Sequence, residues 1–320
     1  MTDRSPTETG EPQAVFPFIV GCARSGTTLL RAMLDSHASL AIPPESYFVA
    51  TFARRRLHVA SGGGFDRDAF LEAICSDRWF RGWGMDDAIV RTAFARERPM
   101  GAAHAIRVVY GVYASSRGKP RYGDKTPTYV FSMRSIGTVL PEARFVHLIR
   151  DGRDVAGSLV SSGMRFAPTD LGRALLFWER RVVAGRRQGQ KLGVHRYREV
   201  RYEDLVEDPE AILRGLSAFL ELDYQPDMLR YHERVDEVLS GVPGQRHHRH
   251  LAEAPVKGLR DWRRELSSSD IQLADALIGN TLDTFGYERT TSAQQARTKV
   301  HALRLRIGVD LRRAAQSLRA

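Results

Sequence analysis

The sequence predicts an α/β fold in which a central parallel sheet is flanked by helices and carries a helical insertion. Apolar segments rich in β-forming residues, at 16–20, 144–150 and 194–205, alternate with segments of helical periodicity. Strands separated by helices pair in parallel, and the helices cover both faces of the sheet. Between 66 and 118 short amphipathic segments are separated by glycines, which indicates the insertion.

The first strand leads directly into a turn and a helix within 16–34, FPFIVGCARSGTTLLRAML. Gly21 and Gly26 bound the turn, and apolar residues at helical spacing follow. Such a loop directs successive backbone N–H groups and a helix N-terminus toward one point, which makes an anion site. Arg24 adds a cation at this point. Three hydroxyls also surround it: Ser25, Thr27 and Thr28. The segment therefore predicts a phosphate-binding loop and a P-loop-like core.

The spacing Gly21-x-x-x-x-Gly26-Thr27-Thr28 matches the loop of nucleotide hydrolases, except that Thr27 replaces their lysine. That lysine contacts the β- and γ-phosphates of a nucleoside triphosphate, so its replacement argues against hydrolysis of ATP or GTP. The cation of this loop is Arg24, three positions earlier. A P-loop kinase or other phosphotransferase, which would use Mg²⁺, is the first alternative.

A second anion site is predicted where the strand RFVHLIR ends. Arg150 stands at its carboxyl end, the edge at which open α/β sheets bind ligands. Ser158 follows in the next helix. An arginine fork suits phosphate because it donates two parallel hydrogen bonds. Two other interpretations stay open here: a surface salt bridge from Arg150 or Arg153 to Asp151 or Asp154, and a magnesium site at Asp151.

The two motifs together resemble sulfotransferases that use 3′-phosphoadenosine 5′-phosphosulfate. The resemblance covers roughly 16–288 in ordered blocks and leaves 60–115 largely unmatched. From Arg24 to His37 the chain is similar to tyrosylprotein and glycan sulfotransferases. It implies that the 5′-phosphosulfate is bound by Arg24, Ser25, Gly26, Thr27 and Thr28. It also implies that Arg150 and Ser158 bind the 3′-phosphate.

Two later segments extend the resemblance. VRYEDLVEDPEAILRGLSAFLELDY is similar to a stretch of bacterial sulfotransferases whose tyrosine, here Tyr202, approaches the nucleotide. PVKGLRDWRREL resembles the C-terminal lid of the family, marked by Trp262. The lid implies that Lys257 or Arg260 contacts the phosphates of the co-substrate. A packed aromatic that anchors a loop is the alternative for Trp262.

Sulfonate transfer requires a donor held in line, stabilisation of the departing phosphate and removal of the acceptor's proton. The resemblance implies Glu45 as the general base, because related enzymes carry a glutamate at about this place. It also implies Lys125, in GDKTP, as a cation that bridges the sulfonate and the leaving oxygen, together with Arg24.

Each catalytic prediction has an alternative. A carboxylate near a helix N-terminus is favoured by the helix dipole, which would explain Glu45 without catalysis. Lys125 could be a surface lysine paired with Asp124. Some sulfotransferases use a histidine as base, and His37 and His104 are available.

The composition predicts the compartment and the organisation of the chain. Residues 1–15 are polar, and no segment approaches the length of an apolar membrane span. Cys22 and Cys75 are too few for a disulfide framework, so we expect a cytoplasmic protein. We expect a disordered tail over 1–15, a sulfotransferase domain over 16–288 with its helical insertion at 60–118, and a basic amphipathic extension over 289–320.

The formal net charge of +10 suits nucleic acid, an anionic membrane or an anionic small ligand. The arginines are spread along the chain, so nucleic acid is not expected, although a non-catalytic basic binding protein is the second alternative. The extension 297–320 has one apolar face: Val300, Leu303, Ile307, Leu311, Ala314 and Leu318. Such a helix contacts a membrane, its own domain or a partner subunit, so peripheral membrane contact and a homo-oligomer stay open.

The expected ligands follow from the resemblance. The co-substrate is 3′-phosphoadenosine 5′-phosphosulfate, and the acceptor carries a hydroxyl on a glycan, a small molecule or a peptide tyrosine. No metal is expected, because the histidines of QRHHRH at 247, 248 and 250 have no paired cysteine or carboxylate at ligand spacing.

Overall fold

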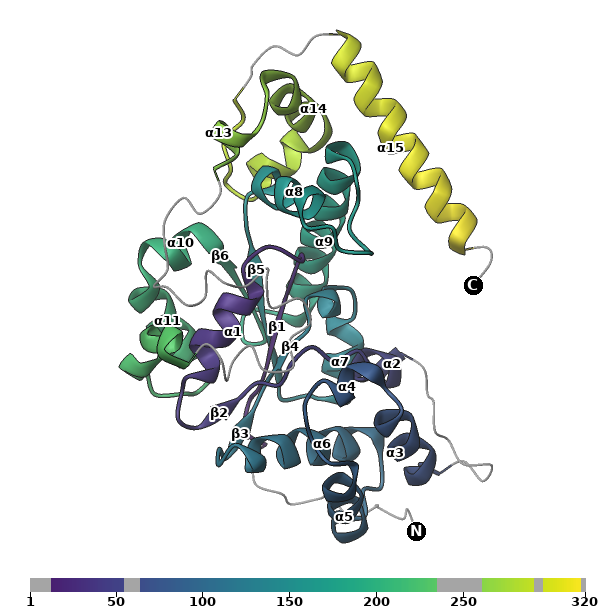
Figure 1. Ribbon diagram of the computed structural model, residues 1–320, viewed down its shortest axis with the longest axis vertical. Helices are drawn as coiled ribbons and strands as arrows, with labels where there is room; N and C mark the ends of the chain where they lie inside the picture. Colours follow the sequence, from purple (N-terminus) through teal and green to yellow (C-terminus); the bar gives the residue numbers. More distant parts are fainter. Residues whose placement is uncertain (1–12, 55–63, 235–260, 291–295, 318–320) are drawn as a thin grey trace, which may run out of the picture.

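The computed structural model describes residues 13–54, 64–234, 261–290 and 296–317. Its main sheet has four parallel strands in the order β4-β1-β5-β6 (Figure 1). The strands are β1 Phe16–Gly21, β4 Asp124–Lys125, β5 Ala143–Ile149 and β6 Tyr197–Arg201. The predicted α/β fold with a central parallel sheet is confirmed.

Helices cover both faces of this sheet because its strands alternate their side chains between two apolar layers. Ile19 packs with α1 (Thr27–Asp35), α11 (Pro209–Phe219) and η2 (Pro226–Arg234). Phe18 packs on the other face, toward α7 and the insertion. The remaining helices of this core are α2 Phe48–Arg54, η1 Pro127–Phe131, α7 Met133–Val139, α8 Gly152–Ser161, α9 Leu171–Leu192, α10 Tyr202–Glu207, α13 Trp262–Glu265, α14 Ser268–Thr284 and α15 Ala296–Ser317.

The predicted insertion is helical, with α3 Arg67–Cys75, α4 Arg78–Arg81, α5 Asp87–Glu97 and α6 Ala102–Ser116. Aspartates at the N-caps of α3, α4 and α5 accept bonds from the first free backbone N–H groups. Phe70 joins the helices, since its ring lies 4.2 Å from that of Phe52 and 5.9 Å from that of Phe94. A second, parallel pair of strands, β2 Leu40–Ala41 and β3 Arg121–Tyr122, connects the insertion to the core.

One predicted strand is too long. The segment 194–205 forms a strand only over β6, Tyr197–Arg201, and Tyr202 begins α10. Glu203 and Asp204 lie in the first turn of that helix, where the helix dipole favours acidic side chains. Tyr202 therefore lies at the carboxyl edge of the sheet rather than within it.

None of the helices in the described ranges combines the length and the apolar character that a membrane-spanning helix needs.

Candidate active site

The loop after β1 has the backbone conformation of an anion site. Arg24 has a φ of 72°, which is unusual for a residue with a side chain, and Gly26 has a φ of 91°. A Cβ atom on Gly26 would lie 2.4 Å from the ring of Tyr202, so only glycine fits at this position. Helix α1 begins at Thr27, and its free N–H groups face the loop.

The two predicted anion sites adjoin one another. The Nε atom of Arg24 donates a hydrogen bond of 2.9 Å to the Oγ atom of Ser158, although the residues are 134 positions apart. Ser158 lies on α8, which follows β5, and Arg24 lies in the loop after β1, the neighbouring strand. The crossover geometry of the parallel sheet thus brings both residues to one edge.

Arg150 is held rigidly at the end of β5. Its guanidinium lies 4.4 Å above the ring of Tyr202 and 3.6 Å from the carboxylate of Asp154. Its carbonyl oxygen accepts a 3.0 Å bond from the indole of Trp178. The Tyr202 ring therefore contacts both Arg150 and the glycine of the phosphate loop.

The buried polar atoms at this edge that have no hydrogen-bond partner among the described residues include Ser25 Oγ and Arg150 Nε. Buried polar groups are nearly always hydrogen-bonded in folded proteins. Phosphate or sulfonate oxygens would supply acceptors to both atoms. The residues at this edge therefore fit an anionic co-substrate of the predicted kind.

Asp151 does not suit a magnesium site, because its carboxylate is fully engaged by Arg153. Arg153 Nε donates to one oxygen at 3.0 Å, and Nη2 donates to the other at 2.7 Å. Asp151 also caps α8 through the N–H of Arg153. Arg153 therefore forms an ion pair, but both partners are buried, so the prediction of a surface salt bridge is wrong for this pair.

Trp262 is a packed aromatic that anchors α13. Its ring lies 3.6 Å from the guanidinium of Arg153, and its backbone N–H donates a 2.8 Å hydrogen bond to the carboxylate of Asp154. Burial raises the pKa of Asp154 to about 6. Lys257 and Arg260, the predicted phosphate contacts of the lid, lie outside the described residues.

Glu45 and Lys125 form an ion pair of 2.7 Å between Oε1 and Nζ. The Lys125 side chain is 1% exposed and that of Glu45 is 26% exposed, so only the carboxylate is accessible. Tyr47 donates a 3.2 Å bond to the other carboxylate oxygen. The alternative of a surface lysine paired with Asp124 is wrong. Glu45 lies three residues before Phe48, where α2 begins, so its position also agrees with the alternative of a carboxylate near a helix N-terminus.

Asp124 points away from Lys125 because neighbouring residues of a strand face opposite sides. Its Oδ2 atom accepts bonds from Tyr110 at 2.6 Å and Ser46 at 3.0 Å. Ser46 also bonds the hydroxyl of Tyr129 at 2.9 Å. This buried network fixes the residue next to Glu45. It was not predictable from the sequence, because no apolar pattern in GDKTP marks Asp124 as buried.

We predict that Asp124 makes the stability of the protein pH-dependent. Burial raises the pKa of its carboxyl from 3.8 to about 7. Between about pH 4 and pH 7 the folded protein therefore holds a proton that the unfolded chain has released, and stability falls as pH rises. The free energy of unfolding, measured in urea, should decrease as pH rises through this range in the protein that carries Asp124. Relative to the Asp124→Asn variant, the decrease should be at most about 1.4 kcal/mol per pH unit. Parallel pH curves for the two proteins would contradict this assignment.

A sequence profile described as "Sulfotransferase family" matches residues 18–226, well over half of the chain. The protein belongs to the sulfotransferase family. The matched range includes the phosphate loop, the Glu45–Lys125 pair and Arg150 at the end of β5. The resemblance expected from the sequence is therefore confirmed.

Individual relatives agree with this assignment. Over 280 residues the sulfotransferase is 26% identical to protein-tyrosine sulfotransferase 1 of Danio rerio, spanning 85% of this chain and 72% of that protein. It is 25% identical to the protein-tyrosine sulfotransferase of Drosophila melanogaster, over 71% of this chain but only 42% of the fly protein. The sulfotransferase domain from the Synechococcus PCC 7002 olefin synthase shares the fold, with a TM-score of 0.58 and 21% identity over 90% of this chain and 99% of that one.

The two histidines considered as bases have other surroundings. His37 is buried, its Nδ1 accepts a bond from the N–H of Ser39 at 3.0 Å, and its Nε2 donates to the carbonyl of Asp223 at 2.8 Å. Burial also lowers its pKa. His104 is an exposed residue of α6. His37 is therefore a structural residue of this sulfotransferase.

Arg181 on α9 is a candidate site residue that the sequence did not reveal. Its guanidinium packs 3.2 Å from the ring of Phe177, and burial lowers its pKa to about 10. Its electrostatic neighbours include Tyr47, which bonds Glu45, and Cys22 of the phosphate loop. Burial raises the pKa of the Cys22 thiol to about 12, so this cysteine is not a nucleophile.

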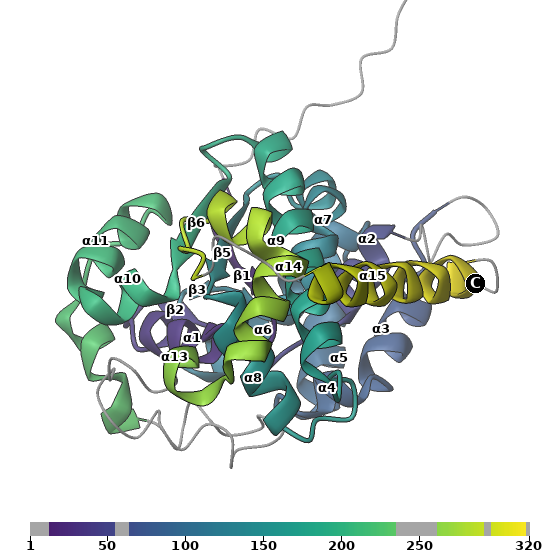
Figure 2. The ribbon, with the colours of Figure 1, turned by 90° about the horizontal axis from the view of Figure 1, so that it is seen from above.

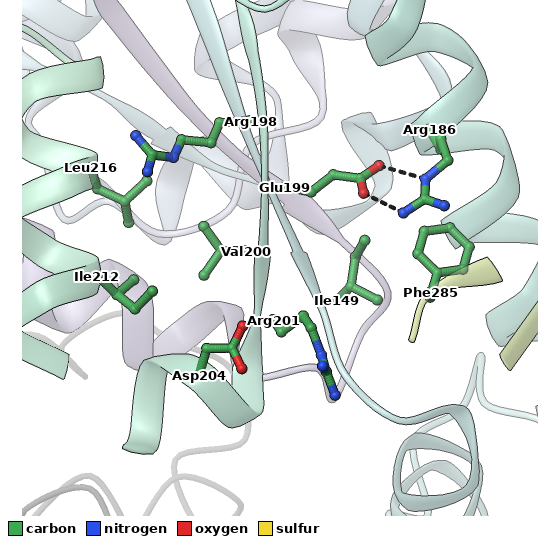
Figure 3. Close-up of a pocket in the computed structure, with 10 residues that line it drawn as sticks. All are labelled: Ile149, Arg186, Arg198, Glu199, Val200, Arg201, Asp204, Ile212, Leu216 and Phe285. Atoms are coloured by element: carbon green, nitrogen blue, oxygen red, sulfur yellow. Dashed lines mark hydrogen bonds and ion pairs between the residues drawn. The ribbon is translucent and has the colours of Figure 1, made fainter. Parts of the chain in front are cut away.

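Figure 3 shows a separate cavity of about 290 Å³ at the free edge of β6. It is lined by Ile149, Arg186, Arg198, Glu199, Val200, Arg201, Asp204, Ile212, Leu216 and Phe285. Arg186 and Glu199 form a paired salt bridge on one wall. Of the predicted site residues that the structure describes, none lines this cavity, although Ile149 and Arg201 directly precede Arg150 and Tyr202.

The histidine, cysteine and acidic side chains of the described ranges contain no group of three or more that could hold a metal ion. The histidines at 247, 248 and 250 lie outside those ranges. Metal-independent transfer stays a prediction.

Proposed function

We propose that this protein transfers a sulfonate group from 3′-phosphoadenosine 5′-phosphosulfate to an acceptor hydroxyl, without a metal ion. The observation that carries the proposal is the ion pair between the accessible Glu45 and the buried Lys125. Lys125 ends β4, the strand that lies beside β1 and its phosphate loop. We propose that Lys125 acts on the co-substrate from this neighbouring strand, in place of the loop lysine that Thr27 replaces.

The residues at the sheet edge divide into two sets for donor binding. Arg24, Ser25, Gly26, Thr27 and Thr28 would hold the 5′-phosphosulfate. Arg150 and Ser158 would hold the 3′-phosphate, while Tyr202 would fix the nucleotide beside them. The lid residues Lys257 and Arg260 complete the proposed phosphate contacts. The buried unpaired atoms Ser25 Oγ and Arg150 Nε, one in each set, support this division.

Catalysis would follow from the positions of three charged side chains. Glu45 accepts the proton of the acceptor hydroxyl as the acceptor oxygen bonds to sulfur. The bond between sulfur and the 5′-phosphate oxygen breaks, and its electron pair stays on that oxygen. Lys125 and Arg24 stabilise the resulting charge. The products are a sulfated acceptor and 3′,5′-adenosine bisphosphate.

The acceptor is proposed only as a class. Two of the relatives are protein-tyrosine sulfotransferases by name, so a peptide tyrosine is the first acceptor to test. A screen of acceptors with a labelled donor would then include glycans and small hydroxyl compounds. Tyr47, whose ring lies 4.7 Å from that of Trp79, forms an aromatic wall beside Glu45 on which such acceptors could rest.

Ligand-induced stabilisation tests the donor. We expect 3′,5′-adenosine bisphosphate to raise the midpoint of thermal unfolding equally with and without EDTA. At one hundred times the dissociation constant, the ligand would add about 2.7 kcal/mol to the free energy of unfolding. Stabilisation by ATP–Mg²⁺ but not by the bisphosphate would favour a phosphotransferase. Stabilisation by neither would overturn the proposal.

A further inference from the structure

The C-terminal helix α15 is fixed on the domain by one face. Ala302 is buried, and Leu305 and Val309 pack against the apolar cluster formed by α8, α9 and α14. Arg306 also donates a 2.8 Å bond to Glu179 of α9. Figures 1 and 2 show α15, in yellow, on the outside of the molecule beside α14. Since this face is determined by packing, the orientation of the opposite face is determined as well.

The opposite face of α15 is apolar and exposed. Its large side chains are Val300, Leu303, Ile307 and Leu311, with exposed fractions of 50%, 58%, 49% and 66%. Steps of three and four residues keep these four side chains on one line along the helix. Ala302, Leu305 and Val309 fall about half a turn away from that line. Contiguous exposed apolar side chains of this kind mark an interaction surface.

The charge of α15 indicates the partner of this apolar line. Lys299, Arg304 and Arg312 are exposed, with Arg304 nearest the line, whereas Asp310 is the one acidic residue in the sequence of α15. A second copy of the helix would bring like charges together along the contact, which opposes self-association. An anionic membrane supplies both an apolar layer for the side chains and negative head groups for the cations.

We propose that α15 docks this protein on an anionic membrane surface. The helix lies in the plane of the interface, with Val300, Leu303, Ile307 and Leu311 buried among the lipids and with its basic residues at the head groups. The proposal does not depend on the sulfonate-transfer function, because it concerns a different surface of the domain.

Sedimentation with vesicles tests this surface. We expect the full chain to bind vesicles in which about a third of the lipid is phosphatidylserine, and to bind phosphatidylcholine vesicles weakly. Leu303→Ser with Leu311→Ser should lower the partition constant at least about tenfold. Arg304→Gln with Arg312→Gln should lower binding to the anionic vesicles selectively. Added salt should act in the same direction as this charge variant.

A matched control is provided by two apolar side chains elsewhere that are more exposed than Leu303 and Leu311. Met100 and Val194 are 84% and 79% exposed, and replacing both with serine should leave vesicle binding unchanged. Circular dichroism and the midpoint of thermal unfolding establish that each variant is folded. Two results would overturn the proposal: equal vesicle binding by the α15 serine variant, or sedimentation analysis showing a dimer that this variant dissociates.

Discussion

Replacing Glu45 with glutamine is expected to lower kcat by about 10²- to 10⁴-fold, the usual loss when a general base is removed. Glutamine keeps the size of the side chain and can still accept a bond from Lys125. Affinity for 3′,5′-adenosine bisphosphate should therefore stay within about twofold of the original. Single-turnover transfer from labelled donor, with calorimetry for the bisphosphate, measures the two quantities separately.

Glu142 provides the matched control for this substitution. It is also a glutamate in an ion pair, with Arg107 at 2.8 Å, but it is more buried than Glu45 and lies outside the candidate site. Glu142→Gln should leave kcat unchanged. Lys125→Met should also lower kcat, and the double variant with Glu45→Gln should lose less than the product of the two separate effects. Full activity of Glu45→Gln would remove this residue as the base.

Replacing Arg150 with methionine is expected to affect unequally the protein's affinities for two nucleotides that differ only in the 3′-phosphate. Loss of hydrogen bonds from a guanidinium to phosphate should weaken binding of 3′,5′-adenosine bisphosphate by about 10- to 100-fold. Affinity for adenosine 5′-monophosphate should change little, because that nucleotide has no 3′-phosphate. Isothermal titration calorimetry with both nucleotides gives the ratio of the two affinities directly.

Arg24→Met serves as the complementary variant, because Arg24 is assigned to the 5′ end of the nucleotide. It should weaken the binding of both nucleotides. The assignment of Arg150 is wrong if its variant lowers both affinities to the same extent. Arg24 bonds Ser158, so Ser158→Ala shows whether that hydroxyl acts on the 3′-phosphate or only orients Arg24.

Local features of this site were predictable from the sequence. The strand, loop and helix from Phe16 to Leu34 are adjacent in the chain, and their apolar periodicity and glycines determine their form. Arg150 was expected at a strand end for the same reason, since RFVHLIR is a continuous apolar strand. Parallel pairing then brings these two strand ends together without further information.

Contacts between distant, short segments were not predictable. β4 has only two residues, so no periodic pattern marks it, yet it places Lys125 beside Glu45, 80 positions away. The burial of Asp124 depends on Tyr110 and Tyr129, which belong to different helices. Tyr202 was expected near the nucleotide, but its contact with Gly26 depends on where β6 ends.

The register of β4 also limits how the length of this chain can vary. Asp124 pairs with Phe18 and Lys125 with Ile19, so the two side chains face opposite sides of the sheet. One residue inserted between Gly118 and Asp124 would exchange these faces and point the Lys125 ammonium group toward Tyr110 and Tyr129, where Asp124 now lies. Insertions and deletions should therefore be rejected there, while the turn between α8 and α9, at 163–170, should tolerate them.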